Sequence, residues 1–217
     1  MPDYKKAATF AAQVLIDSDI EKTPISPFHI LKSLDNVQLI PFSEIASSFN
    51  MDRDELINSF GESRAAVTSM KEINGQKYYF VAYSQYMPTI LIQRALAREL
   101  GHIILGHDGS RPVEVRMAEA YCFAHHLLTP RAVIKMLQES PYPLTHEVLN
   151  NVTGCNRECF ERMRLLPGVN VPAELNRAIR DKFSKSLHDF FAYQDIIDYN
   201  DNTDIIDFGT YMNNYIE

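Results

Sequence analysis

A glutamate and a histidine in the segment Arg98-Glu99-Leu100-Gly101-His102 have the spacing found in the active helix of zinc peptidases. On a helix, residues four apart lie one turn from each other on the same face. Zinc peptidases place two histidine ligands at this spacing, with a glutamate between them beside the metal-bound water. Glu99 takes the glutamate position and His102 the second histidine position, whereas Arg98 stands in place of the first histidine. Spacing alone therefore predicts an incomplete zinc-peptidase-like helix.

A second polar segment could supply a further ligand to the same site. The stretch from Glu114 to Pro130 carries Glu119, followed by Cys122 and His126. In zinc-peptidase sites the third protein ligand comes from a second helix and can be a carboxylate. Because this stretch also has a helical pattern, Glu119 is the candidate for that ligand.

Both segments resemble signatures of one protein family, the ImmA/IrrE endopeptidases. The Glu-Leu-Gly-His-x-x-Leu-Gly-His stretch at 99–107 looks like the active helix of that family, whose usual form begins His-Glu-Leu-Gly-His. The Ala-Glu-Ala-x-x-Phe-Ala-x-x-Leu-Leu-x-Pro stretch at 118–130 resembles the second family signature. The order of the surrounding elements also fits, including an arginine-leucine pattern at 162–166. The resemblance covers roughly residues 7–166.

The resemblance implies a role for each matched residue. By that match Glu119 is the zinc-binding carboxylate, His102 is a zinc ligand and Glu99 is the general base. It also implies an α+β fold of the zincin type, mostly helical with a small, largely antiparallel sheet. Family members are intracellular zinc endopeptidases that commonly cleave a helix-turn-helix repressor encoded beside them, in phages, integrative elements or stress responses. Zinc is therefore the expected cofactor and a repressor-like protein the expected partner.

Arg98 prevents the family mechanism from being carried over unchanged. A guanidinium is charged at neutral pH and has no lone pair to offer a metal. Catalytic zinc normally takes three protein ligands and a water, and only His102 and Glu119 remain here. The sequence therefore predicts an impaired metal site.

Three alternatives remain open for this site. In the first, Arg98 replaces the metal by pairing with Glu119 and also with Glu99, and the protein is an inactive pseudo-protease that binds a partner. In the second, Arg98 turns to solvent and another ligand completes the zinc site. Cys122 and His126 lie one and two turns beyond Glu119, so either could do so, and Glu99 would deprotonate the zinc-bound water. In the third, Arg98 is an engineered or accidental change in an active enzyme.

Other residues near the signatures have simpler interpretations. His107 follows the active helix at a spacing that favours a cap or loop contact over a metal ligand. His125 is expected to be exposed, because it lies on a different face from His126. Cys122 is expected to be a small buried hydrophobic residue if it is not a ligand.

Turn and cap residues predict the elements that position the site. Asn74-Gly75 suits the positive φ angles of a tight hairpin turn between strands at 67–73 and 77–84, and the second strand alternates between two unlike faces. Asp3 is expected to cap the first helix, which carries apolar residues through Leu15. Further helices are predicted from Pro27 and at 43–49, 52–60, 89–105, 112–128, 130–137, 145–152, 157–166 and 172–193, with a short strand at 37–40.

Composition bounds the class of protein and its partners. The 217 residues are 46% hydrophobic and 23% charged, as in ordinary globular proteins. The formal net charge of −7 opposes binding to phosphate backbones, so direct nucleic-acid binding is not expected, although 42–52 and 144–154 imitate helix-turn-helix segments. No window is apolar enough to span a bilayer. Three cysteines and no signal peptide indicate a reduced, cytoplasmic protein.

The chain is expected to divide into three parts. Residues 1–140 form the zincin-like domain, 141–193 form a helical region, and 194–217 form an acidic tail without a basic residue. Cys155 and Cys159 share a predicted helical face, but no second cysteine pair exists to complete a zinc site, so core packing is expected.

Overall fold

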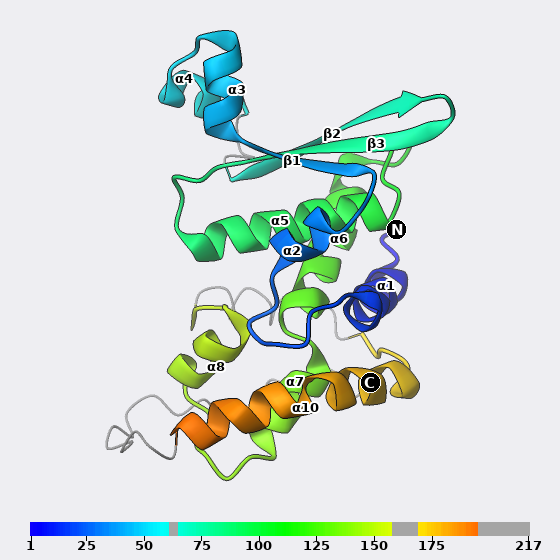
Figure 1. The fold of residues 1–217 in the computed structure, drawn as a ribbon. Coiled ribbons are helices and arrows are strands. Elements are labelled where there is room, and N and C mark those ends of the chain that lie inside the picture. The colour runs from blue at the N-terminus through cyan, green and yellow to red at the C-terminus, as the bar shows by residue number, and fades with distance from the viewer. Residues whose placement is uncertain (61–64, 158–168, 195–217) are drawn as a thin grey trace.

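The computed structural model describes residues 1–60, 65–157 and 169–194 (Figure 1). The helix predicted at 157–166 lies outside the described residues beyond its first position. Cys159 and the acidic tail after Gln194 also lie outside them.

The fold is α+β, with helices in the majority and one small sheet, as predicted. Most elements begin and end close to the predicted positions, and the side chain of Asp3 caps the first helix by accepting a hydrogen bond from the amide of Lys6 at 2.9 Å. The helices are α1 (Tyr4–Asp17), α2 (Pro27–Lys32), α3 (Phe42–Phe49), α4 (Arg53–Ser59), α5 (Thr89–Ile104), α6 (Val113–Leu128), α7 (Arg131–Gln138), α8 (His146–Thr153) and α10 (Ala173–Gln194), and the strands are β1 (Val37–Pro41), β2 (Ala66–Ile73) and β3 (Gln76–Tyr83).

The sheet is mixed, with strand order β1-β3-β2. Strands β2 and β3 form the predicted antiparallel hairpin, in which Ala66 pairs with Tyr83. Its turn uses Asn74 and Gly75, both at positive φ (53° and 78°), which is the geometry that favours this dipeptide. Strand β1 pairs with β3 in parallel, with Val37 opposite Tyr79, so the sheet is antiparallel only on its β2 side.

Different helices cover the two faces of the sheet (Figure 1). Val81 and Ala66 belong to the main core, to which α2 and α5 also contribute. Their neighbours Ala82 and Val67 point to the other face and pack with Phe42 in a second cluster formed with α3 and α4. The predicted alternation of the second hairpin strand is therefore confirmed.

The main core is centred on α6, which packs against both α5 and α1. Helices α5 and α6 approach closely at Gly101, where an added Cβ atom would lie 3.0 Å from Cδ1 of Phe123. The absence of a side chain at Gly101 is therefore what lets the fully buried ring of Phe123 pack against the helix that carries Arg98, Glu99 and His102.

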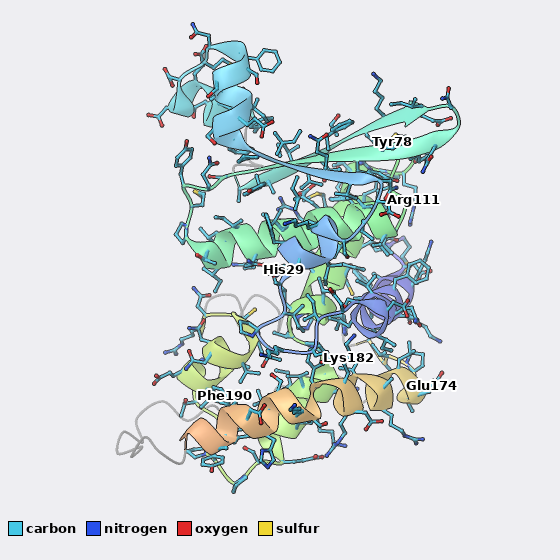
Figure 2. The ribbon with its side chains drawn as sticks, in the orientation of Figure 1. His29, Tyr78, Arg111, Glu174, Lys182 and Phe190 are labelled. Atoms are coloured by element: carbon cyan, nitrogen blue, oxygen red, sulfur yellow. The ribbon has the colours of Figure 1, made fainter. Side chains whose placement is uncertain are left out.

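The last described helix shares this core. Ile179, Phe183 and Leu187 of α10 are buried in the same cluster as the apolar residues of α1 and α7. Lys182, labelled in Figure 2, donates through Nζ to the backbone carbonyl of Ile16 at 3.0 Å and to that of Ser18. It thereby supplies hydrogen bonds to carbonyl groups at the C-terminal end of α1. None of the helices in the described ranges is both long enough and apolar enough to cross a membrane.

Candidate functional site

Helix α5 carries Arg98, Glu99 and His102 as the spacing predicts. The helix is continuous from Thr89 to Ile104, so Arg98 and His102 are one turn apart on one face. Glu99 is buried, with 5% of its surface exposed. Burial raises the pKa of Glu99, while the charge of Arg98 and contacts from Thr68 on β2 act in the opposite direction.

A left-handed turn at the end of α5 brings His107 back toward His102. Gly106 has φ 68°, a conformation that glycine adopts at little cost. The amide of His107 donates to the carbonyl of His102 at 3.0 Å, and the amide of Gly106 donates to that of Ile103 at 3.1 Å. This is a glycine-terminated C-cap, and it places the residue after the glycine beside the last turn of the helix. His107 thus makes the cap contact predicted for it.

Glu119 of α6 accepts hydrogen bonds on both carboxylate oxygens. Its Oε1 accepts from the backbone amide of Asp3 at 2.6 Å. Its Oε2 accepts from Nη1 of Arg111 at 2.7 Å and lies 3.0 Å from Nε2 of His107. Burial favours the neutral acid, but the hydrogen bonds from Asp3, His107 and Arg111 outweigh it and lower the pKa of Glu119. Glu119 is therefore an ionised carboxylate in a site that leaves 2% of its side chain exposed.

His102, His107 and Glu119 form a continuous chain of polar contacts. Nδ1 of His102 lies 2.8 Å from Nδ1 of His107. Burial lowers the pKa of His102 to about 4 and also lowers that of His107, so both rings are neutral near pH 7. Because ionised Glu119 can only accept, His107 donates from Nε2 and accepts on Nδ1, and His102 then donates from Nδ1. We assign these tautomers from the hydrogen-bond network.

Arg98 pairs with its sequence neighbour Glu99. Its Nη2 and Nε atoms lie 3.1 Å and 3.3 Å from Oε1 of Glu99. Its Nη1 donates to the hydroxyl of Tyr121 at 3.4 Å, and the guanidinium lies 5.7 Å from the centre of the Tyr121 ring. The guanidinium therefore holds the carboxylate that the family resemblance assigns as the general base.

The first of the three alternatives had Arg98 pair with Glu119 and also with Glu99; in the structure Arg98 pairs with Glu99, and Glu119 has a different partner. Arg111, in the loop between α5 and α6, supplies the cation to Glu119 instead. Arg111 is labelled in Figure 2 and also donates to the backbone carbonyl of Met1 at 3.3 Å. The guanidinium of Arg98 instead contacts Glu99 and Tyr121. Sequence reasoning missed Arg111 and Tyr121, because neither belongs to a metal-ligand pattern.

Cys122 and His126 do not join the chain of His102, His107 and Glu119. Cys122 is fully buried and its Sγ donates to the carbonyl of Tyr4 at 3.6 Å, as expected of a small core residue. Burial raises the pKa of its thiol to about 12, so the thiolate that binds a metal is strongly disfavoured there. His126 lies farther along α6, and within the described residues its buried Nε2 has no hydrogen-bond partner.

The prediction that His125 is exposed is wrong, because only 5% of its surface is accessible. The last half of α6 lies inside the core, where both faces of the helix are covered. Nδ1 of His125 lies 2.8 Å from the hydroxyl of Thr129, which gives this nitrogen of the buried ring a hydrogen-bond partner.

His126 should make the stability of the protein depend on pH. Burial, and then the charge of Arg131, lower its pKa in the folded state to about 4, whereas the unfolded chain binds this proton below about pH 6.5. The unfolded state therefore holds more protons between these values, and the free energy of unfolding falls as the pH falls from 6.5 toward 4. We expect His126→Leu to remove about 3 kcal/mol of that decline. Denaturant unfolding at several pH values measures it.

The matched control for this prediction is the exposed His29, labelled in Figure 2, as His29→Leu. That variant should keep the parent's decline. Equal pH slopes in the parent and in His126→Leu would contradict the expectation.

The side chains as placed do not fit the zinc ion that the resemblance implies. In the described parts of the chain, no group of three or more histidine, cysteine, aspartate or glutamate side chains is arranged to hold a metal ion. Arg98 offers no lone pair, both oxygens of Glu119 already accept hydrogen bonds, and the ring of His107 stands between His102 and Glu119.

The comparisons with known proteins give no relative. No protein-family model matches the sequence, and comparison with curated proteins and with solved structures finds no match. The resemblance to the ImmA/IrrE family therefore rests on the two sequence signatures alone.

Proposed function

We propose that this chain is an ImmA/IrrE-type pseudo-protease of zincin-like fold, which regulates a helix-turn-helix repressor of a phage or mobile element by binding it without cleaving it. The ion pair between Arg98 and Glu99 carries this proposal. A family enzyme needs a metal ligand at position 98 and a carboxylate at position 99 that is free to take a proton from water. Here Arg98 stands in place of the metal ligand and also forms an ion pair with Glu99, the residue at the position of the general base.

The hydrogen bonds of Glu119 support the same proposal. A zinc ligand must offer an oxygen lone pair to the metal, and a positive charge next to that oxygen opposes metal binding. Arg111 places such a charge 2.7 Å from Oε2. Any zinc that the chain takes up would be held weakly.

The free edge of the sheet supports a protein partner. Within the described residues β2 pairs with β3 on one side only, so its other edge is open to strand addition. Thr68 of β2 lies beside Glu99, which places this edge next to the candidate site. Met70 and Ile73 on the same strand are exposed apolar residues that a partner could cover.

The test uses the full chain and, as the partner, any helix-turn-helix repressor encoded beside its gene. We expect the two proteins to form a complex that survives a metal chelator, and we expect no cleavage of the repressor with or without added zinc. Titration calorimetry and gel electrophoresis measure the two quantities. Met70→Lys with Ile73→Lys should weaken the complex, because charges on an edge strand oppose pairing. Phe49→Lys is the control, since Phe49 is an exposed apolar residue on α3 and not on β2.

Two results would contradict the proposal. Zinc-dependent cleavage of the repressor would show a working enzyme, and the metallo-endopeptidase function would replace the one proposed. If the repressor did not bind at all, it would be excluded as the partner of this chain.

A further inference from the structure

The guanidinium of Arg98 has more hydrogen-bond donors than its neighbours use. An arginine side chain carries five N–H groups in one plane. The N–H of Nε and one of Nη2 are directed at Oε1 of Glu99, and one of Nη1 is directed at the hydroxyl of Tyr121. Within the described residues, nothing accepts from the second hydrogen of Nη1 or of Nη2. These two nitrogens form the end of the guanidinium fork, which binds a carboxylate through two parallel hydrogen bonds.

The fork is held in place and is partly open to solvent. The side chain of Arg98 is 15% exposed, and Tyr121 beside it has 45% of its surface exposed. Contacts with Glu99 on one side and with the ring of Tyr121 on the other restrict the rotation of the guanidinium. A side chain that is already ordered loses little freedom when it binds a partner. Arginine and tyrosine are also the residue types that most often dominate the binding energy of protein interfaces.

The charges around Arg98 favour an anionic ligand. Arg116 of α6 adds a second positive charge, which acts on His102 together with that of Arg98. Burial raises the pKa of Glu99, which favours its neutral form and reduces the negative charge next to the guanidinium. A carboxylate from another molecule would therefore meet positive charge here, although the chain as a whole has a formal net charge of −7.

We propose that Arg98 and Tyr121 bind a carboxylate side chain of the repressor, carried by an extended segment that adds to the open edge of β2. The inference rests on the proposed function, and it names the chemistry of the contact as an aspartate or glutamate. Thr68 of β2 and Arg98 both contact Glu99, so a segment paired with β2 would pass close to the fork. Arg98 thereby contributes to binding as well as standing in place of a metal ligand.

The experiment titrates the repressor into the full chain by calorimetry, for the parent, Arg98→Gln, Arg98→Lys and Arg94→Gln. We expect Arg98→Gln to raise the Kd roughly 30-fold. Arg98→Lys keeps a positive charge beside Glu99 if Arg98→Gln does not fold, and it should raise the Kd about 10-fold because an ammonium lacks the fork. Arg94→Gln is the control. It removes the same charge one turn away on α5 and should change the Kd by at most about threefold.

A second set of titrations identifies the carboxylate. Each exposed aspartate or glutamate of the repressor is changed singly to asparagine or glutamine, and each variant is titrated into the parent and into Arg98→Gln. We expect one of these changes to weaken the complex with the parent but not to weaken the complex with Arg98→Gln any further. Such non-additivity is the signature of two side chains in direct contact.

The outcomes separate this inference from the proposed function. Equal losses in Arg98→Gln and Arg94→Gln, or no coupling between Arg98 and any acidic residue of the repressor, would overturn the inference and leave the pseudo-protease proposal standing. No binding of the repressor to the parent would overturn both. Sedimentation of the chain alone tests the other occupant, a second copy of this chain. A dimer that Arg98→Gln dissociates would place the carboxylate on that copy and overturn the assignment to the repressor.

Discussion

Replacing Glu119 by alanine should lower the free energy of unfolding by about 3 kcal/mol. The variant leaves the amide of Asp3 and the buried Nε2 of His107 without their acceptor, and it leaves the guanidinium of Arg111 without its counter-ion. Arg111 has 43% of its side chain exposed and can turn to water, so most of the cost falls on the buried ring of His107. Urea unfolding at pH 7 measures the difference.

Glu114→Ala is the matched control, since Glu114 is an exposed glutamate on the same helix. Surface changes of this kind alter stability by a few tenths of a kcal/mol. If the two variants lose the same stability, the contacts of Glu119 with Asp3, His107 and Arg111 do not stabilise the fold.

Phe123→Ala should cost about 3 to 5 kcal/mol, because it removes a fully buried ring and leaves a cavity between α5 and α6. Gly101→Leu should cost about 1 to 3 kcal/mol in the parent, since its Cβ would already lie 3.0 Å from the Phe123 ring. Combining the two should cost less than the sum of the single variants, because the leucine enters the space that the ring vacates.

Denaturant unfolding of the four proteins in this cycle measures the coupling. Phe10→Ala is the control, as Phe10 is a phenylalanine on α1 with 37% of its surface exposed, and it should lose much less stability. Strictly additive losses from Gly101→Leu and Phe123→Ala would show that the two helices do not meet at this point as described.

Elements with strong local signals could be predicted from the sequence. Asn74-Gly75 fixed the hairpin because few other dipeptides adopt two positive φ angles cheaply. Pro88 and Gly106 bounded the helix that carries Arg98, Glu99 and His102. The parallel pairing of β1 with β3 had no such signal, since it joins segments that are distant along the chain and depends on how α2 and α5 pack beneath them.

The candidate site likewise has residues whose positions the sequence predicts and residues whose positions it does not. Its two helices and the positions of Glu99, His102 and Glu119 follow from periodicity, whereas the partner of Glu119 comes from a loop whose path periodicity does not describe. The position of His107 had a signal in the Gly106-His107 pair, because a glycine after a helix returns the next residue toward the last turn. For His125 the signal was the run of small and apolar residues around it in the second half of α6, which indicates a buried segment of helix.

The bond from Lys182 to the end of α1 joins residues 166 positions apart in the chain. Contacts of such long sequence separation form late, because the loop between them must first be closed. During synthesis α1 would leave the ribosome long before α10, with Leu15 and its neighbours still lacking their final cover. We therefore expect the nascent chain to remain sensitive to protease, and to bind chaperones, until α10 has emerged. For most of its synthesis the apolar residues of the core would be exposed.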